Sequence, residues 1–185
     1  MNKERENLSK FISLILRHKP ETIGISLDTY GWANVDELLD GINSSNNHKI
    51  DREILEDIVN NDSKQRYSFN ENKTKIRANQ GHSIKVDVEL KEVIPPDILY
   101  HGTATRFINS IELSGLKSMS RLHVHLSKDY ETAINVGKRH GEPIVLEIDA
   151  KRMHDDNYKF YLSDNGVYLT EFIPTNYIKF KVWEN

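Results

Sequence analysis

The sequence predicts an α+β protein with a helical N-terminal lobe and a C-terminal lobe richer in strands. Apolar residues recur at helical spacing in the first third of the chain, and short apolar runs typical of strands follow later. A stretch that contains Pro95-Pro96 separates the two patterns. Strands and helices do not alternate regularly in the second half, which argues against a Rossmann domain. We expect a first lobe over 1–84, a linker over 85–97 and a second lobe over 98–185.

Three amphipathic helices are expected in the first lobe. The first should end near His18, because Pro20 disfavours helical geometry at the residue before it. Asn34 can cap the second helix in a capping box with Glu37, and Asp51 can cap the third. The apolar stripes of the three helices are Leu8, Phe11, Ile12, Ile15 and Leu16; Val35, Leu38, Leu39 and Ile42; and Ile54, Leu55, Ile58 and Val59.

A β-hairpin should follow the helices. Tyr67 and Phe69 lie on one face of its first strand, Asn70-Glu71-Asn72 form the turn, and residues 73–78 form the return strand. Side chains alternate between the faces of a strand, so three cations of the return strand should share a face. They are Lys73, Lys75 and Arg77. Three helices and a basic hairpin describe a winged-helix module, and the alternative is a hairpin with a solvated cationic face.

The second lobe should contain strands mixed with two helices. One helix covers 106–114 and ends at Gly115, and the other covers 129–139 and is capped by Ser127. The expected strands are 98–100, 122–126, 144–148, 159–162, 167–172 and 177–183. His101 should lie at the end of the first of these strands.

The composition limits the classes of function. The 185 residues include no cysteine, which excludes disulfides, thiolate metal sites and a cysteine nucleophile. No apolar run approaches ~18 residues and the N-terminus has no signal-peptide core, so we expect a cytoplasmic protein without a membrane span. We also expect a monomer. A net charge of −3 argues against binding nucleic acid by bulk attraction. Five cations and one acid between Lys64 and Arg77 suit a specific anionic substrate instead.

The segment from Arg77 to Ser83 is the most informative stretch of the chain. It contains Arg, Asn, Gln, His and Ser around a glycine, and no apolar periodicity accounts for it. Arginine supplies a planar fork of donors for a phosphate, and Asn79 and Gln80 supply amides for ribose or base edges. The alternative is a polar loop with a turn glycine.

Other cations and histidines could join the same chemistry. Arg17 and His18 end a helix, where the dipole alone favours cations, and Arg121 lies in a polar context. Several arginines converging on one point would bind a phosphate dianion. His123 and His125 share a strand face and could form a zinc pair, but no third ligand with metal-site spacing is evident. We expect no metal.

Seven segments in the same order resemble the RNA 2′-phosphotransferase family, which provides the last enzyme of eukaryotic tRNA splicing and has bacterial and archaeal members. The resemblance covers nearly the whole chain. The segments are Leu8-Ser9-Lys10-Phe11, Leu16-Arg17-His18-Lys19-Pro20, Tyr30-Gly31-Trp32, Arg77 to Ser83, Leu99-Tyr100-His101-Gly102-Thr103, Met119 to Ser127, and Asn165 to Thr170.

The resemblance implies an NAD-dependent reaction on an RNA that carries a 2′-phosphate, tRNA-like in kind. The 2′-phosphate attacks ribose C1″ of NAD and expels nicotinamide, which gives a 2′-phospho-ADP-ribosylated RNA. Ribose O2″ then attacks phosphorus and releases RNA with ADP-ribose 1″,2″-cyclic phosphate. It also implies that the second lobe has the ADP-ribosyltransferase fold, with NAD as co-substrate. In the first step neither nucleophile nor leaving group needs a general acid or base, and the second step needs a proton taken from O2″.

The resemblance also implies roles for particular residues. His101, His125 and Val167 match the three positions of an NAD-binding signature, the third of which is a glutamate in many ADP-ribosyltransferases. Ser127 either contacts NAD or only caps the next helix. Asn157 stands where family members usually have glycine, and asparagine tolerates left-handed geometry. The implied catalytic residues are Arg17, His18, Arg77 and Arg121; those for NAD are His101, Gly102, Thr103, His125, Ser127 and Val167; and those for RNA are Lys73, Lys75, Asn79, Gln80, His82 and Ser83.

Two other functions remain open from the sequence. The first is an ADP-ribosyltransferase that modifies another anionic end, such as a 5′-phosphorylated nucleic acid, and stops after the first step. The second is a non-catalytic winged-helix nucleic-acid binder with an inert second lobe.

Overall fold

The computed structural model describes residues 3–45 and 48–180, and the chain divides into two compact units, Met1–Glu89 and Leu90–Asn185. Helices occur in both units, and every strand pairing among the described residues is antiparallel. Antiparallel sheets with segregated helices define the α+β class that the sequence predicts.

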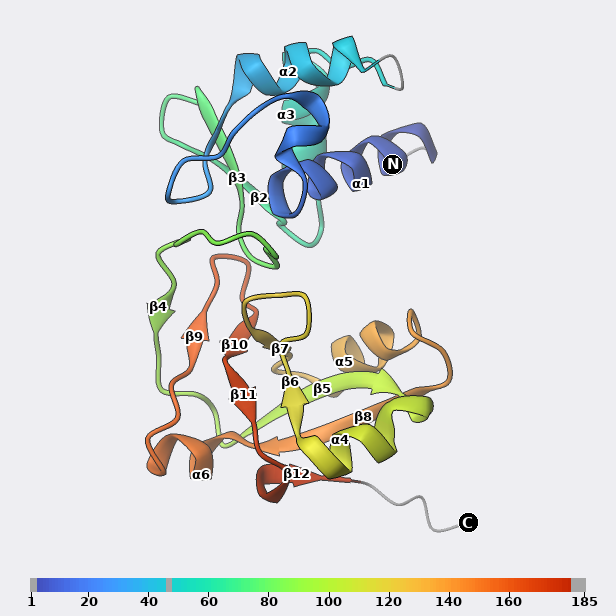
Figure 1. Ribbon diagram of the computed structural model, residues 1–185, viewed down its shortest axis with the longest axis vertical. Coiled ribbons are helices and arrows are strands. Elements are labelled where there is room, and N and C mark those ends of the chain that lie inside the picture. Colours follow the sequence, from blue (N-terminus) through green and yellow to red (C-terminus); the bar gives the residue numbers. More distant parts are fainter. Residues whose placement is uncertain (1–2, 46–47, 181–185) are drawn as a thin grey trace. The chain divides into compact units, whose positions relative to one another are not determined.

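The first unit packs three helices against a small sheet (Figure 1). The strand order β1-β3-β2 places the return strand of the hairpin in the centre. The apolar stripes of the helices meet in one core, in which Leu16, Leu38, Leu55 and Ile76 are fully buried. The elements are α1 (Lys3–Arg17), a 3₁₀ helix (Pro20–Ile23), β1 (Ala33–Asn34), α2 (Val35–Ser44), α3 (Arg52–Asn60), β2 (Tyr67–Phe69) and β3 (Lys75–Ala78).

The helix ends of this unit confirm the local sequence signals. Helix α1 ends at Arg17, and Pro20 opens the following 3₁₀ helix. The Asn34 Oδ1 atom accepts hydrogen bonds from the backbone N–H groups of Asp36 and Glu37, at 2.9 and 3.1 Å. At the start of α3, Asp51 Oδ1 accepts from the N–H of Ile54 at 2.8 Å. Each cap satisfies backbone donors that a helix start leaves without an intrahelical partner.

The hairpin turn is longer than the sequence predicts, and the placement of Lys73 in the return strand is wrong. Lys73 adopts a left-handed φ of +54° in the turn, and β3 begins at Lys75. Asparagine side chains extend this turn: Asn70 Oδ1 accepts from the Lys75 N–H at 2.8 Å, and Asn72 Oδ1 accepts from the Thr74 hydroxyl at 2.7 Å. Such side-chain bonds compete with strand pairing. Lys73 therefore does not share the strand face of Lys75 and Arg77.

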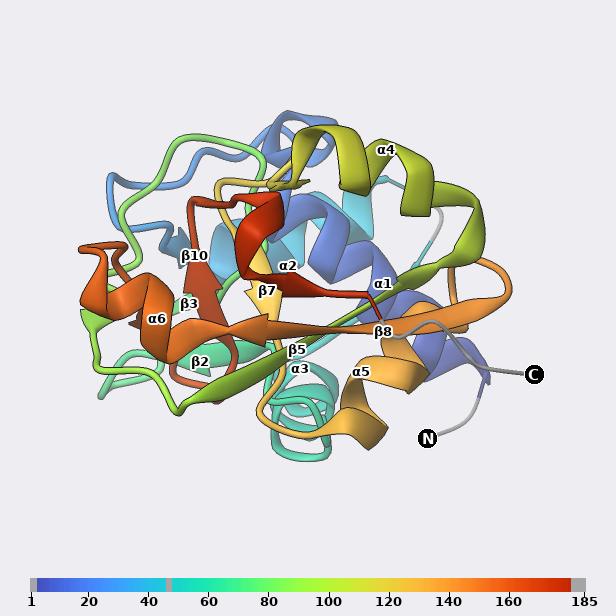
Figure 2. The same cartoon turned by 90° about the horizontal axis from the view of Figure 1, so that it is seen from below.

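The second unit contains three small sheets and short helices. A long β5–β8 pair makes up most of one sheet, and α5 packs against it (Figures 1 and 2). The strand orders are β12-β8-β5, β4-β9-β10-β7 and β11-β6. The elements are β4 (Lys91–Glu92), β5 (Ile98–Ala104), a 3₁₀ helix (Thr105–Phe107), α4 (Ile108–Ser114), β6 (Leu116–Lys117), β7 (Val124–Leu126), α5 (Tyr130–Gly137), β8 (Pro143–Asp149), α6 (Ala150–Asp155), β9 (Tyr161–Leu162), β10 (Tyr168–Thr170), β11 (Phe172–Ile173), a 3₁₀ helix (Thr175–Tyr177) and β12 (Ile178–Lys179).

Several sequence expectations for this unit need correction. Asp129, not Ser127, caps α5, because the Ser127 backbone is still extended and exchanges two hydrogen bonds with Tyr100; Asp129 Oδ1 accepts from the Thr132 N–H at 2.7 Å. His101 lies within β5 rather than at its end. Strand β4 falls inside the expected linker and pairs with β9. Of the predicted strand 177–183, residues 181–183 lie outside the described residues.

Other expectations for the second unit are confirmed. Gly115 ends α4 with a φ of +72°, and its N–H donates to the Ile111 carbonyl. Asn157 adopts a left-handed φ of +69°, the geometry for which asparagine is tolerated in place of glycine. Helix α6 was not among the predicted helices; it is only six residues long and carries no extended apolar stripe.

Glycine at position 102 allows α5 to approach β5 closely. A Cβ atom at Gly102 would lie 1.7 Å from the Ala133 carbonyl oxygen, and one at Gly137 would lie 2.6 Å from the Thr103 carbonyl oxygen. Neither position tolerates a side chain unless the helix moves. The helix and the strand that carries His101 are therefore held at backbone contact.

We expect Gly102→Ala to lower the free energy of unfolding by about 3 kcal/mol or more, since the new methyl group overlaps helix backbone that cannot rotate away. Thermal unfolding followed by circular dichroism measures this effect. Gly166→Ala is the control: nothing lies within 4 Å of the added Cβ, and only its φ of +77° opposes the change, at a cost of about 1 kcal/mol. Equal losses in the two variants would contradict the packing argument.

Candidate functional site

The end of α1 and the polar segment after β3 meet in the first unit. The Ser83 N–H donates to the Arg17 carbonyl oxygen at 3.0 Å, and the Ser83 hydroxyl lies 2.9 Å from His18 Nδ1. His18 and Ser83 are 65 positions apart in the sequence, and backbone and side-chain hydrogen bonds join their two segments. The structure brings three of the expected catalytic residues, Arg17, His18 and Arg77, into one neighbourhood around His82.

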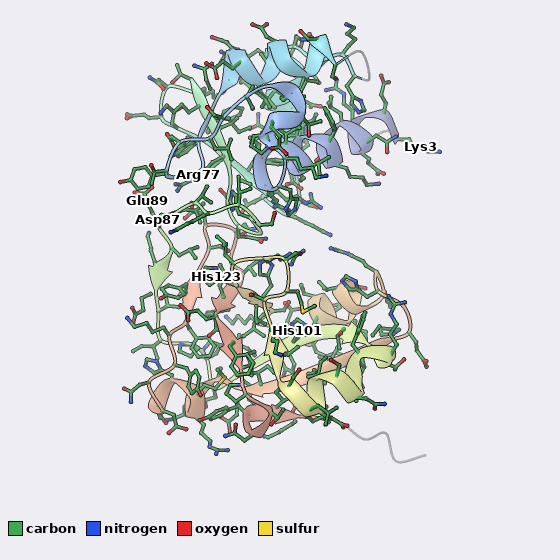
Figure 3. The ribbon with its side chains drawn as sticks, in the orientation of Figure 1. Lys3, Arg77, Asp87, Glu89, His101 and His123 are labelled. Atoms are coloured by element: carbon green, nitrogen blue, oxygen red, sulfur yellow. The ribbon has the colours of Figure 1, made fainter. Side chains whose placement is uncertain are left out.

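Arg77 is a buried cation on β3. Its neighbours on the strand, Ile76 and Ala78, face the core, and Arg77 points to the other face with 8% of its surface exposed. Its guanidinium carbon lies 4.5 Å from the centroid of the Trp32 ring. Its Nη1 atom donates to Glu89 Oε2 at 3.0 Å, and both residues are marked in Figure 3. The contacts restrict the guanidinium on its flat face and at one nitrogen.

His82 is a neutral histidine beside these cations. Burial and, to a smaller extent, the positive charges of Arg17, His18 and Arg77 together lower the pKa of His82 to about 4. The buried atoms His82 Nε2 and Gln80 Oε1 have no hydrogen-bond partner among the described residues. Buried polar atoms of this kind are rare and indicate a bound water, an ion or a ligand. The polar segment therefore has the character of a ligand site.

Other residues expected to bind RNA have protein partners in this unit. Asn79 is buried; its Nδ2 group donates to the Gln65 carbonyl at 2.7 Å, and its Oδ1 atom accepts from the Ser68 hydroxyl at 2.7 Å. Its amide thus fixes the segment to the hairpin. Lys73 and Lys75 are exposed, and each forms an ion pair with a carboxylate, of Glu56 and Asp28 respectively. Their contact with RNA stays a prediction.

In the second unit, a hydrogen-bond chain links Arg121, His125 and His101. The Nδ1 atom of His101 lies 2.9 Å from the His125 carbonyl oxygen, which can only accept, so this nitrogen carries the proton. Arg121 Nη1 can only donate, so His125 Nδ1, 3.0 Å away, accepts and the proton of that imidazole is on Nε2. The remaining nitrogens differ in character: His101 Nε2 is an acceptor and His125 Nε2 a donor.

Further positively charged residues lie near the hydrogen bonds that link Arg121, His125 and His101. Burial lowers the pKa of His101, and nearby His140 and Arg121 lower it further although the hydrogen bond to His125 raises it. Burial also lowers the pKa of Arg121, with Arg139 as an additional cause. Arg139 and His140 follow α5 and were not predicted as site residues, because nothing in their local sequence distinguishes them from a charged helix end. Cations placed near one another favour an anionic ligand.

The remaining residues expected to bind NAD lie on or near the same strands. Gly102 and Thr103 follow His101 in β5 and are buried. Ser127 pairs with Tyr100, which links the end of β7 to β5. Val167 is half-buried and lies farther along the chain, in the turn before β10, where its carbonyl accepts from the Ser163 N–H and its N–H donates to the Ser163 hydroxyl. Glycine at 102 is explained by the helix contact alone.

The described residues contain no group of three or more His, Cys, Asp or Glu side chains that could hold a metal ion. His123 contacts the Tyr161 ring edge-on, with centroids 5.8 Å apart, and burial lowers its pKa while Glu171 raises it. No helix in the described part of the chain is long and apolar enough to cross a membrane.

Comparison with known proteins identifies the class of enzyme. The model of the RNA 2′-phosphotransferase, Tpt1 / KptA family matches residues 3–172. A probable RNA 2′-phosphotransferase of Fusobacterium nucleatum subsp. nucleatum is 63% identical over 174 residues, which cover 94% of this chain and 97% of the relative. One of Flavobacterium johnsoniae is 52% identical over 176 residues, with 95% and 96% covered. One of Acaryochloris marina is 50% identical over 177 residues, with 96% and 97% covered.

These matches extend through both units and show that the chain is an enzyme of the phosphotransferase class. The chain belongs to the RNA 2′-phosphotransferase family, whose members remove a 2′-phosphate from RNA. The resemblance found in the seven sequence segments is thereby confirmed.

We expect the buried His82 to make the first unit less stable as the pH falls. Its pKa is about 4 when folded and 6.5 ordinarily, so the unfolded chain binds more protons between these values. The free energy of unfolding should therefore rise with pH in this window, by up to about 1.4 kcal/mol per pH unit from this residue, and level off above it.

Denaturant unfolding at a series of pH values measures this slope, with Trp32 emission as the probe in a Trp183→Phe background. His82→Gln removes the titrating group and should flatten the dependence between pH 4 and 6.5. The same slope in both proteins would contradict the assignment of a neutral, buried His82.

Proposed function

We propose that this enzyme removes an internal RNA 2′-phosphate by transferring it to NAD. The products are RNA with a free 2′-hydroxyl, nicotinamide and ADP-ribose 1″,2″-cyclic phosphate, formed through a 2′-phospho-ADP-ribosylated RNA. The observation that carries the proposal is the joining of Arg17 and His18 to the segment of Arg77 and Ser83, in a chain that belongs to this family. A tRNA-like RNA is the proposed substrate.

The fold of each lobe is part of the proposal. For the first lobe, 1–84, three helices and the strand order β1-β3-β2 support a winged-helix module that binds RNA. For the second lobe, 98–185, the separate small sheets around β5 and β7 support an ADP-ribosyltransferase-like fold that binds NAD. Residues 85–97 connect the lobes in this proposal.

The donors and acceptors of the second unit suit a dinucleotide. His101 Nε2 can accept a hydrogen bond from a ribose hydroxyl, and His125 Nε2 can donate one. Arg121 and Arg139 supply positive charge for a pyrophosphate. Gly102, Thr103, Ser127 and Val167 are proposed to complete this site. When bound, NAD supplies the electrophilic ribose carbon and a neutral leaving group.

In the proposed reaction, only the second step requires acid–base catalysis by the protein. We propose that Arg17 and Arg77 stabilise the charge of the phosphate, that Arg121 contributes to catalysis from the NAD site, and that His18 contacts the phosphate or moves the proton of the second step. His18 Nδ1 is engaged by the Ser83 hydroxyl, which orients the ring. Lys73, Lys75, Asn79, Gln80, His82 and Ser83 are proposed to hold or shape the RNA site.

Product analysis tests this function. We expect an oligoribonucleotide with one internal 2′-phosphate to lose it only when NAD is present, with cyclic phosphate of ADP-ribose and nicotinamide formed in equal amounts. A chelator should leave the rate unchanged, because the proposed groups are arginines and histidines and need no divalent cation. The same RNA with a 2′-hydroxyl is the control.

Two outcomes would contradict the proposal. Removal of the phosphate without NAD, or abolition by the chelator with rescue by added metal, would exclude the proposed mechanism. An adduct of ADP-ribose that persists on the wild-type RNA product, or on a 5′-phosphorylated RNA alone, would favour the alternative ADP-ribosyltransferase that stops after the first step.

We expect His18→Ala to separate the two chemical steps. Attack on C1″ needs an anion held in line, which the remaining arginines supply. Attack on phosphorus must also move a proton, and loss of a positioned acid–base group costs about 100-fold or more in that step. The variant should accumulate RNA with a 2′-phospho-ADP-ribose branch, seen as a slower-migrating band that forms only with NAD.

His48→Ala is a matched control, because His48 lies in the same unit but packs its ring against Phe11, with centroids 5.0 Å apart. It should process the RNA without accumulation of the branched species. A His18→Ala variant that releases no nicotinamide and forms no adduct at any time would refute the division of labour between the two steps.

A further inference from the structure

Two residues without a role in the proposed reaction contact Arg77 directly. The Trp32 ring centroid lies 4.5 Å from the guanidinium carbon, and Glu89 Oε2 lies 3.0 Å from Nη1. We propose that Trp32 and Glu89 are positioning residues that fix the Arg77 guanidinium for the phosphate, and we call the pair the arginine clamp. The inference rests on the proposed function, in which Arg77 acts on the 2′-phosphate.

Trp32 is presented by a turn that is tied to the strand of Arg77. Asp28 Oδ1 accepts from the N–H groups of Tyr30 and Trp32, each at 3.0 Å, and the Asp28 N–H donates to the Trp32 carbonyl at 2.9 Å. The other carboxylate oxygen pairs with Lys75 Nζ at 3.0 Å. Lys75 lies two residues before Arg77 on β3, so the turn and the arginine share one anchor. The indole is therefore held in register with the guanidinium.

Glu89 is held by its backbone as well as by its charge. It adopts a left-handed φ of +57°, a conformation that costs a non-glycine residue energy and needs support from its surroundings. The Asp87 carboxylate accepts the Glu89 N–H at 2.9 Å, and the Asp87 N–H donates to the Thr29 carbonyl at 2.9 Å. Asp87 and Glu89 are marked beside Arg77 in Figure 3. The same segment thus joins the turn of Trp32 to the partner of Arg77.

The geometry favours a clamp, which fixes the Arg77 guanidinium, over a placeholder, which occupies the guanidinium until phosphate displaces it. A carboxylate on an arginine could be displaced when phosphate arrives, and such a placeholder would weaken substrate binding. The backbone of Glu89 is instead anchored through Asp87 to Thr29, and contacts on the flat face and at one nitrogen restrict the tilt and rotation of the guanidinium. The orientation of the whole planar group is restricted in this way. Positioning of this kind acts on the rate of the chemical step rather than on substrate affinity.

Steady-state kinetics with 2′-phosphorylated RNA and NAD tests the clamp. We expect Trp32→Leu and Glu89→Gln each to lower kcat by about 10- to 100-fold, because misplacement of a catalytic group by about 1 Å has effects of this size. The KM for RNA should change by less than about threefold, since uniform binding is not lost. Trp32→Phe keeps an aromatic face and should retain most of kcat.

Glu92→Gln is the matched control for the carboxylate. Glu92 forms an ion pair with Lys159 at 2.9 Å and is 55% exposed, against 3.0 Å and 59% for Glu89. Its loss should leave kcat unchanged. A lower KM with undiminished kcat in Glu89→Gln would establish the placeholder and overturn the clamp. Equal defects in Trp32→Phe and Trp32→Leu would also overturn it, because the ring face would then have no role.

Emission of Trp32 tests the contact without the reaction. The chain has two tryptophans, so Trp183→Phe leaves Trp32 as the sole emitter. In that background Arg77→Ala should change the emission, whereas Arg52→Ala, whose arginine pairs with Asp36, should not. Unchanged emission in Arg77→Ala would overturn the clamp. If instead the wild-type enzyme fails to release nicotinamide with the phosphorylated RNA, the proposed function fails while the emission result still decides the contact.

Discussion

The first unit is organised around a cation that is buried. A guanidinium removed from water loses favourable hydration, and it is stable only where contacts replace that loss. For Arg77 the replacements come from three separate parts of the chain: the Trp32 ring, the Glu89 carboxylate and the strand that presents it. The turn of Asp28, the left-handed Glu89 and the hairpin all contribute to this one environment. Each of these three local structures contributes a contact to Arg77 or holds a residue that does.

In the second unit, hydrogen bonds fix the orientation and the proton position of two imidazole rings. A free histidine exchanges its proton between two nitrogens, whereas His101 and His125 each have one nitrogen engaged by a group of fixed hydrogen-bonding character. A backbone carbonyl fixes the first ring and an arginine fixes the second. The pair therefore offers one acceptor and one donor, which matches the hydroxyl groups of a sugar better than a metal ion, which would need two acceptors.

The sequence predicts those features that depend on neighbouring residues. The caps at Asn34 and Asp51, the end of α1 before Pro20 and the left-handed Asn157 follow from side chains within a few positions. Features that depend on distant contacts are missed. Ser127 does not cap α5 because its backbone pairs with Tyr100.

The candidate site follows the same division. The polar segment after Arg77 is visible in the sequence because its composition fits no core element. Arg17 and His18 are singled out by the family resemblance, since the dipole at a helix end alone favours cations there. Glu89 carries no such signal, since a lone glutamate in a polar stretch is common, and only the fold shows that it reaches Arg77. The basic cluster of the hairpin is visible as charge, but the partners of Lys73 and Lys75 come from α3 and from the turn at Asp28.

The close approach of α5 to β5 affects how variation at position 102 should be interpreted. Because any Cβ there would overlap the Ala133 carbonyl, every related protein with this helix placement requires glycine at that point. Invariance of this glycine would therefore report on packing between helix and strand and would not count as a sign of ligand contact. The adjacent His101 instead donates from Nδ1 to the His125 carbonyl, so its retention among relatives would report on that hydrogen bond and on any contact made by Nε2.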